Sequence, residues 1–302
     1  MPKPPLLMLV EHPELFGLEH VGDLYDLRHA PAPGIEAALS SGNGVDAAML
    51  AAAPDLKMIA LSVVGYDKVD VAGARARGIV ISNTPDVLTD DVADLALGLM
   101  IAVARRLPAH DRFVREGRWP QEGPPALTRR ASGRRVGVLG LGRIGQAIAA
   151  RAQPFAAAVG YYSRRPRDEG ATYHYCDTPL ALARWADVLI VAVAGGAKTA
   201  GLVSREVIEA LGPDGMLINI ARGSVVEEPA LVAALSDGRL GAAGLDVFAH
   251  EPNVPEALLA MDNVVLVPHQ GSATRETRAA MGQLALDNLA AFFAGEPLLT
   301  PI

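Results

Sequence analysis

Three closely spaced glycines that follow a short apolar run constrain this chain more than any other feature. Residues 136–139 are apolar, Gly140, Gly142 and Gly145 come next, and residues 144–155 then show helical periodicity. In a β-α-β unit the first glycine allows a tight turn, the second lets the backbone approach a ligand closely, and the third lets the helix pack on the strand. The pattern predicts the opening strand, turn and helix of a doubly wound parallel sheet.

Apolar runs and helical segments alternate through the rest of the second half of the chain. The expected strands are residues 136–139, 158–163, 188–193, 216–220, 242–247 and 264–267. The expected helices are residues 144–155, 180–185, 205–211, 229–235 and 275–294. This alternation is typical of a parallel sheet with right-handed crossover helices. Shorter strand-like runs at residues 6–10, 47–50, 58–61 and 79–82 predict a second, smaller α/β unit.

The length of 302 residues also favours two domains. Residues 90–107 have apolar side chains at helical spacing, and we expect this helix to cross from one domain into the other. The expected fold class is therefore α/β, with two doubly wound parallel-sheet domains, the larger being a Rossmann dinucleotide-binding domain. We expect a discontinuous, flavodoxin-like domain of residues 1–94 plus 275–302, and the Rossmann domain at residues 95–274.

Composition and charge narrow the classes of function. The net charge of −7 provides no general basic surface for nucleic acid. Cys176 is the single cysteine, so neither an internal disulfide nor a cysteine-based zinc site is expected, and no His-Glu-x-x-His motif for a metal occurs. The apolar runs at residues 6–10 and 95–104 are too short for a signal-peptide core and a membrane span, respectively. We expect a cytoplasmic protein that binds neither nucleic acid nor membrane.

The residues after the second expected strand indicate which dinucleotide the glycine turn binds. Ser163, Arg164 and Arg165 stand where an NAD-specific site usually places an acidic side chain on the ribose 2′-hydroxyl. A carboxylate would repel a 2′-phosphate, whereas a guanidinium group binds one through paired hydrogen bonds. A solvated basic turn is the alternative, but the position favours NADP(H) as the cofactor.

Three polar side chains, Arg222, Glu251 and His269, follow the later expected strands. Taken singly, each has a simple structural explanation, since a lone histidine is often structural and loop arginines and glutamates often form surface ion pairs. Together they supply what reduction of a 2-oxo acid requires: a cation for the carboxylate, a proton donor for the carbonyl oxygen, and a partner that orients the donor. The Tyr-x-x-x-Lys motif of a short-chain reductase does not occur.

These motifs together resemble the D-isomer-specific 2-hydroxyacid dehydrogenase family over essentially the whole chain. The resemblance rests on residues 140–145, 219–223, 244–252 and 268–272. Residues 83–91, the 163–165 turn and Gln270 make the chain most similar to the NADPH-dependent glyoxylate/hydroxypyruvate and hydroxyphenylpyruvate reductases. The resemblance implies an enzyme that reduces small 2-oxo acids, with glyoxylate and hydroxypyruvate favoured, to D-2-hydroxy acids by hydride transfer. Hydroxyphenylpyruvate and 2-ketogluconate remain alternative substrates.

Carried over by motif, the resemblance implies roles for individual residues. His269 is the acid/base, Glu251 its partner and Arg222 a substrate clamp, while the backbone amides of Val64 and Gly65 in the smaller, substrate-binding domain hold the substrate carboxylate. The implied cofactor contacts are Thr89, Gly140, Gly142, Arg143, Ile144, Gly145, Ser163, Arg164, Arg165, Ile220, Ala221, Asp246 and Gly271, with Asp246 on the nicotinamide carboxamide. A homodimer formed through residues 90–107 and their neighbours is also implied.

The chain departs from the family pattern in one place and leaves some alternatives open. Residues 193–199 replace a Pro-Leu-Thr-like stretch that is common in the family, so the contacts beneath the adenosine stay open. Trp119 resembles an aromatic that some members donate to a neighbouring subunit, and an exposed loop aromatic is equally consistent. A phosphoglycerate dehydrogenase would need room for a regulatory domain after residues 275–294. A dinucleotide-sensing corepressor would bind a protein partner, and the acidic composition does not favour that role.

Overall fold

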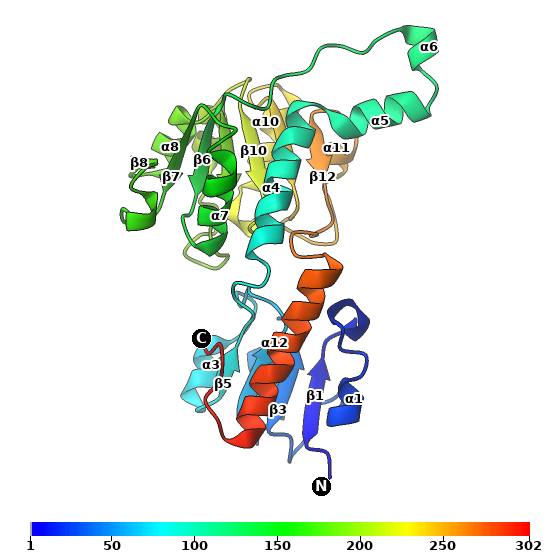
Figure 1. Cartoon of the computed structure of the whole chain (residues 1–302), viewed down its shortest axis with the longest axis vertical. Helices are drawn as coiled ribbons and strands as arrows, with labels where there is room; N and C mark the ends of the chain where they lie inside the picture. Colours follow the sequence, from blue (N-terminus) through cyan, green and yellow to red (C-terminus); the bar gives the residue numbers. More distant parts are fainter. Residues whose placement is uncertain (1) are drawn as a thin grey trace. The chain divides into compact units, whose positions relative to one another are not determined.

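The computed structural model describes residues 2–302, which fold into two compact units (Figure 1). Unit 1 comprises the chain up to Leu88 together with Ser272–Ile302, and unit 2 comprises Thr89–Gly271. Each unit is built on its own parallel sheet, so the predicted fold class is confirmed. The expected division had assigned residues 89–94 to unit 1 and residues 272–274 to unit 2. Residues 89–94 belong to unit 2 because they begin α4 (Thr89–Ala104), one continuous helix that packs on α7 and on β10 and β11.

Unit 1 contains a five-stranded parallel sheet in the order β2-β1-β3-β4-β5. Its strands are β1 (Pro5–Leu9), β2 (Asp26–Arg28), β3 (Ala37–Ser40), β4 (Met58–Leu61) and β5 (Val80–Ser82). Its helical elements are η1 (Pro13–Phe16), α1 (Val21–Leu24), α2 (Ala47–Ala52), α3 (Val71–Ala76) and α12 (Arg275–Ala294). The strand order is that of flavodoxin-like domains. Helix α12 returns the chain to unit 1 and packs against β4 and η1.

One strand-like run in this unit is a helix. Residues 47–50 begin α2, because the Asp46 side chain accepts a hydrogen bond from the amide of Met49 at 2.8 Å and so caps the helix N-terminus. The alanines of this run also favour a helix over a strand. The strands that the apolar pattern missed are β2 and β3, three and four residues long.

Unit 2 contains a seven-stranded parallel sheet in the order β12-β11-β10-β9-β6-β7-β8. Its strands are β6 (Arg135–Leu139), β7 (Ala158–Tyr162), β8 (His174–Cys176), β9 (Val188–Val191), β10 (Met216–Asn219), β11 (Ala242–Leu245) and β12 (Val264–Leu266). The first six strands in chain order have the arrangement of a Rossmann domain, and β12 extends the sheet beyond β11. All four residues of β9 and of β10 are buried, as expected of central strands covered on both faces.

Helices of unit 2 lie on both faces of its sheet, whereas α5 and α6 of the elements named next extend away from it (Figure 1). The helical elements are α4, α5 (Leu107–Arg115), α6 (Trp119–Glu122), α7 (Arg143–Ala152), η2 (Asp168–Gly170), α8 (Pro179–Trp185), α9 (Arg205–Leu211), η3 (Gly223–Val225), α10 (Glu228–Ser236) and α11 (Glu256–Leu259). The expected helix at residues 90–107 is interrupted, because Arg106 adopts a left-handed backbone with φ of 48° and separates α4 from α5. Among the helices of residues 2–302, none combines the length and the apolar composition that a membrane span requires.

The register of the second sheet decides where its loops emerge. Strand β10 pairs in parallel with β11, and β11 pairs in parallel with β12. Parallel neighbours end at the same edge of a sheet, and ligands of open α/β sheets bind at that carboxyl edge. The loops after these three strands therefore emerge next to one another.

Candidate active site

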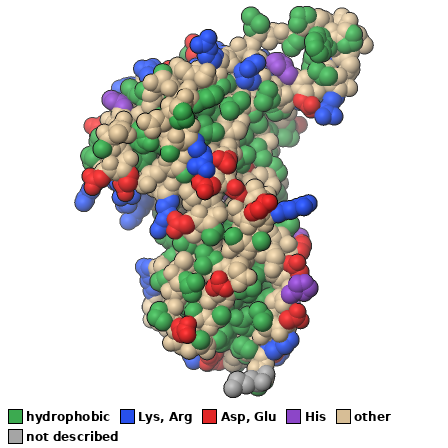
Figure 2. All heavy atoms as spheres, viewed as in Figure 1, with side chains coloured by type: hydrophobic (Ala, Val, Ile, Leu, Met, Phe, Trp, Pro, Cys, Tyr) green, Lys and Arg blue, Asp and Glu red, His purple; other side chains and the backbone are tan. Residues whose placement is uncertain are grey.

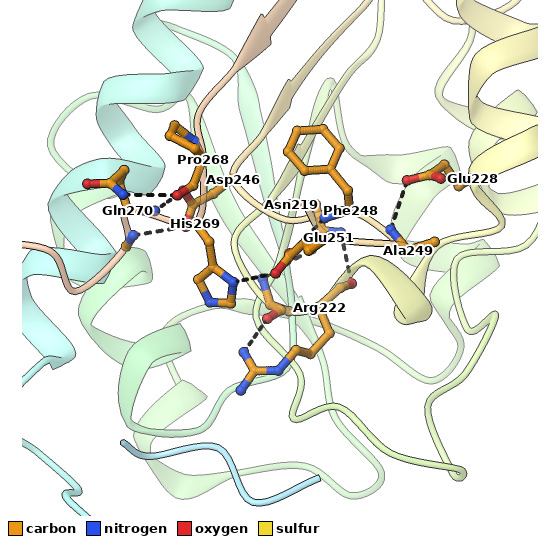
Figure 3. Close-up of polar contacts among 12 residues, drawn as sticks. Asn219, Arg222, Glu228, Asp246, Phe248, Ala249, Glu251, Pro268, His269 and Gln270 are labelled. Carbon is orange, nitrogen blue, oxygen red and sulfur yellow. Dashed lines mark hydrogen bonds and ion pairs between the residues drawn. The ribbon is translucent and has the colours of Figure 1, made fainter. Parts of the chain in front are cut away.

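Arg222, Glu251 and His269 lie on the three loops that follow β10, β11 and β12. Figure 3 shows the side chains of these residues at the edge of the sheet, with the imidazole of His269 and the carboxylate of Glu251 turned toward each other. The parallel pairing of the strands thus gathers an arginine, a glutamate and a histidine that are far apart in the sequence.

The imidazole of His269 is held by the carboxylate of Glu251. The distance from His269 Nδ1 to Glu251 Oε2 is 2.8 Å, and Glu251 Oε1 accepts a hydrogen bond from the amide of Phe248 at 3.0 Å. With Nδ1 donating to the carboxylate, the second ring nitrogen, Nε2, is the position from which a proton can be transferred to a ligand. The His269 side chain is 46% exposed, so it is accessible to such a ligand.

The backbone at His269 is held in a conformation that is rare for a residue with a side chain. Its φ is 54°, and its amide donates to the carbonyl oxygen of Asp246 at 2.8 Å. The next two amides, of Gln270 and Gly271, donate to the two carboxylate oxygens of Asp246 at 2.5 and 2.9 Å. Three successive amides are therefore fixed by one residue of the neighbouring strand end, which offsets the cost of the left-handed backbone.

Asp246 can hold this loop because it is a buried carboxylate. It is 1% exposed, and its burial raises the pKa of the carboxyl, while the amides of Gln270 and Gly271 and the charge of His269 act in the opposite direction. A buried polar group must be hydrogen-bonded to be tolerated, and both oxygens of this one are. The expected contact of Asp246 with the nicotinamide carboxamide stays a prediction.

A buried asparagine shapes the turn that presents Arg222. Asn219 is 1% exposed; its Oδ1 accepts from the amide of Ala221 at 3.1 Å, and its Nδ2 donates to the carbonyl oxygen of Arg222 at 3.0 Å. Arg222 Nη1 donates to the carbonyl oxygen of Ala221 at 2.7 Å. A guanidinium has five N–H groups, so this bond is compatible with a further anion on Arg222.

The loops that carry Arg222 and Glu251 are in direct backbone contact. A Cβ on Gly223 would lie 1.9 Å from the carbonyl carbon of Phe248 and 2.2 Å from the nitrogen of Ala249, so only glycine fits. The carboxylate of Glu228, in the first turn of α10, accepts a hydrogen bond from the amide of Ala249 at 3.0 Å (Figure 3). Glycine at position 223 and the Glu228 carboxylate therefore fix the loop that holds Glu251.

The glycine turn between β6 and α7 has the shape of a cradle for a phosphate group. Gly140 has φ of 104°, and a Cβ on Gly145 would lie 1.9 Å from the carbonyl oxygen of Gly140. A Cβ on Gly142 would meet nothing within 4 Å, so the surrounding protein does not require glycine there. A side chain at position 142 would project into open space, and its absence leaves room for a ligand. This space lies at the N-terminus of α7, which no side chain caps. The turn fits the pyrophosphate of a dinucleotide.

The other expected cofactor residues lie at the start of α7, after neighbouring strands, or at the start of α4. Arg143 and Ile144 begin α7, Ile220 and Ala221 follow β10, and Thr89 begins α4. Ser163 follows β7, the strand next to β6, and the exposed Arg164 and Arg165 come directly after it. The roles of these residues stay predictions. Val64 and Gly65 belong to unit 1, where they follow β4.

Comparisons with known proteins agree with this geometry. A family profile described as "D-isomer specific 2-hydroxyacid dehydrogenase, NAD binding domain" matches residues 97–271. The chain is 50% identical over 272 residues to a hydroxyphenylpyruvate reductase from Plectranthus scutellarioides, covering 90% of this chain and 86% of the relative. The chain belongs to the D-isomer-specific 2-hydroxyacid dehydrogenase family. The predicted family and enzyme class are thereby confirmed.

Two further members of the family show how widely the similarity extends. A 2-ketogluconate reductase from Gluconobacter oxydans is 47% identical over 261 residues, covering 86% of this dehydrogenase and 84% of the relative. The crystal structure of an NADPH-dependent glyoxylate/hydroxypyruvate reductase from Sinorhizobium meliloti, in complex with NADP and malonate, has a TM-score of 0.94 and 43% identity, covering 99% of this chain and 97% of the other. A dinucleotide of the NADP(H) type is the cofactor that these comparisons support.

Three residues contribute to the site in ways that the sequence does not indicate: Asn219 and Gly223, which lie in the 219–223 motif, and Glu228, which lies outside the motifs. Asparagine directly after a strand often forms a local turn with its own side chain, which is the signal that could have indicated Asn219. Glu228 is an acidic residue in the first turn of a helix, where such residues are common for another reason, namely the helix dipole. The requirement for glycine at 223 depends on the path of the 248–249 backbone, which the sequence does not reveal.

We expect Gly223→Ala to reduce kcat/KM at least about 100-fold, because the new methyl group must displace the backbone beside Glu251, and a shift of about 1 Å in a catalytic group can have that effect. Steady-state kinetics with a 2-oxo acid, together with circular dichroism to verify folding, measure the change. The exposed neighbour Ser224, substituted by alanine, serves as the control and should retain wild-type kinetics. A folded Gly223→Ala enzyme with full activity would contradict the structural role of this glycine.

Proposed function

We propose that this dehydrogenase reduces small 2-oxo acids to D-2-hydroxy acids with NADPH, and that glyoxylate and hydroxypyruvate are its main substrates. The observation that carries the proposal is the 2.8 Å pair of His269 Nδ1 and Glu251 Oε2 on loops next to that of Arg222. The pair supplies an oriented proton donor and Arg222 an anion-binding cation, at the edge of the sheet that also carries the glycine turn.

In the proposed reaction, His269 Nε2 donates a proton to the carbonyl oxygen of the substrate. Glu251 fixes the orientation of the ring through its contact with Nδ1, so that Nε2 is left to face the substrate. Arg222 is the cation that binds the substrate and so orients its carbonyl group. In unit 1, the amides of Val64 and Gly65 are proposed to bind the substrate carboxylate. The glycine turn would hold the pyrophosphate of a reduced dinucleotide, and that cofactor would supply the hydride that the carbonyl carbon accepts.

The substrate assignment depends on the names of the relatives. The Sinorhizobium protein is named as a reductase of glyoxylate and hydroxypyruvate, which supports these two substrates here. Hydroxyphenylpyruvate and 2-ketogluconate are the second candidates, favoured by the names of the Plectranthus and Gluconobacter relatives.

We also propose a cytoplasmic location for the protein.

The preference for NADPH over NADH rests on the residues that follow β7. Arg164 and Arg165 are exposed there, and no acidic side chain stands between Ser163 and Arg167. A phosphate on the ribose 2′-position would gain charge-assisted hydrogen bonds from a guanidinium in this turn, whereas a 2′-hydroxyl would not.

A homodimer is also part of the proposal. Large apolar side chains are exposed from α5 to the loop after α6, namely Leu107, Val114, Trp119 and Leu127. Figure 2 shows hydrophobic side chains gathered over this segment. Contiguous exposed apolar surface of this kind often marks a protein interface.

Replacement of His269 by alanine should lower kcat for glyoxylate about 10²- to 10⁴-fold, the range that a positioned general acid contributes. The assay follows loss of reduced-nicotinamide absorbance for wild type and variant with glyoxylate, hydroxypyruvate, hydroxyphenylpyruvate and 2-ketogluconate. His250, the exposed histidine beside Glu251, is the control, and its alanine variant should behave like wild type. If His269→Ala kept more than a tenth of the wild-type kcat, the proposed mechanism would be wrong.

For Arg164→Ala we expect the KM for NADPH to rise about 10- to 100-fold, because a charge-assisted hydrogen bond to the 2′-phosphate is lost, while the KM for NADH changes less than about two-fold. Arg184, an exposed arginine of α8, is the matched control because α8 leads into the opposite, amino end of β9. Equal kcat/KM of the wild type for the two cofactors would refute the proposed preference.

The wild-type protein should elute with twice the mass of one chain in size-exclusion chromatography with light scattering. Changing both Val114 and Trp119 to glutamate should shift this mass toward that of a monomer, because charged side chains are disfavoured in the core of an interface. The control is Leu24→Glu, an exposed leucine of unit 1, which should leave the mass unchanged. A wild-type mass of one chain would exclude the proposed dimer.

A further inference from the structure

The loop that follows β4 in unit 1 has two successive carbonyl groups held by one neighbouring segment. The carbonyl oxygen of Val63 accepts a hydrogen bond from the amide of Thr84 at 3.2 Å. The carbonyl oxygen of Val64 accepts a hydrogen bond from Asn83 Nδ2 at 2.9 Å. Both carbonyl groups therefore face residues 83–84, which come directly after β5.

The direction of these carbonyls determines the direction of two amides. In a trans peptide the C=O and N–H bonds point to opposite sides of the chain, and the cis bond found among residues 2–302 is that of Glu251–Pro252. The amides of Val64 and Gly65 therefore both point away from residues 83–84. In an ordinary strand successive amides alternate in direction, whereas two that point to the same side form a site for an anion.

The segment that holds the carbonyls is itself held by Thr300. The hydroxyl of Thr300 donates to the carbonyl oxygen of Asn83 at 2.6 Å, and the amide of Asn83 donates to the carbonyl oxygen of Thr300 at 3.2 Å. Asn83 is thus bonded on both sides of its backbone, which fixes the position from which its side chain reaches Val64.

Thr300 is in turn fixed from α12 by a fully buried asparagine. Asn288 Oδ1 accepts from the amide of Thr300 at 3.1 Å, and Asn288 Nδ2 donates to the hydroxyl of Thr300 at 3.0 Å. With its oxygen accepting from Asn288, the hydroxyl must use its single proton toward Asn83. On the other side, the amide of Ile302 donates to the carbonyl oxygen of Ile81 at 3.0 Å, so residues 300–302 run alongside β5.

We infer that Thr300 is a positioning residue for substrate binding: through Asn83, it orients the amides of Val64 and Gly65 toward the carboxylate of the substrate. This inference rests on the proposed function, in which those two amides bind the carboxylate. Thr300 acts at a distance, since its hydroxyl touches Asn83 and Asn288 and not the loop itself.

The inference predicts a selective effect on substrate affinity. The proton donor His269 and the glycine turn belong to unit 2, whereas the chain of bonds from Asn288 to Val64 lies wholly in unit 1. Loss of the Thr300 hydroxyl should therefore weaken carboxylate binding and leave the chemical step and cofactor binding unchanged. A purely structural role would instead lower the amount of folded enzyme, which reduces kcat and leaves KM as it was.

The test compares Thr300→Val, which keeps the shape and removes the hydroxyl, with Thr300→Ser, which keeps the hydroxyl. We expect Thr300→Val to raise the KM for glyoxylate about 3- to 10-fold, the usual effect of one hydrogen bond, with kcat and the KM for NADPH within about two-fold of wild type. The Kd of oxalate, measured by calorimetry with saturating NADP⁺, should rise by the same factor. Thr300→Ser and the exposed neighbour variant Leu299→Ala should match wild type.

The outcomes separate this inference from the proposed function. An active wild type whose KM and oxalate Kd are unchanged in Thr300→Val would overturn the role of Thr300 and leave the proposed function intact. A fall in kcat with unchanged KM, or equal effects in the valine and serine variants, would likewise overturn it. A wild type that reduces none of the 2-oxo acids refutes the proposed function, and the oxalate Kd then decides the inference alone. If Thr300→Val fails to fold, Asn83→Ala, which removes the bond to Val64, must raise KM and oxalate Kd without lowering kcat.

Discussion

The parallel pairing of β10, β11 and β12 is the constraint on which the proposed active site depends. It sets the ends of three strands side by side, so that the loops of Arg222, Glu251 and His269 emerge at one edge of the sheet. Buried polar contacts then determine the conformation of each loop. The carboxylate and carbonyl groups of Asp246 fix the amides of residues 269–271, and the backbone contact at Gly223 joins the loops of Arg222 and Glu251.

These contacts share one physical logic. The His269 side chain, which would meet a ligand, is 46% exposed, whereas two residues that hold the backbone of the site loops are buried. Asp246 and Asn219 are each 1% exposed, and each bonds backbone groups of a loop. A buried and fully bonded polar group is difficult to displace, because any alternative conformation leaves it without partners. Buried asparagines also hold the backbone of unit 1. The side chain of Asn83 donates to the carbonyl oxygen of Val64, and that of Asn288 donates to the hydroxyl of Thr300.

Sequence periodicity identified the long elements and failed on several short ones, among them β3, whose four residues are all buried. The helix expected at residues 275–294 coincides with α12, and the expected strands of unit 2 correspond to β6, β7 and β9–β12. The apolar run at residues 47–50 is a helix, because four apolar residues fit either structure and the cap at Asp46 decides between them. The edge strands β2 and β8 were missed, since each has three residues and is only partly buried.

The fold class, the glycine turn and the family could be predicted from the amino-acid sequence, because they depend on local spacing: glycines after a strand, and polar residues after strand ends. Tertiary structure decided the rest. That Gly223 must be a glycine, that Asp246 holds three amides, and that Thr300 contacts Asn83 all depend on which backbone segment passes another. Such contacts join residues separated by long stretches of chain, and nothing in the local pattern around either partner encodes the distance between them.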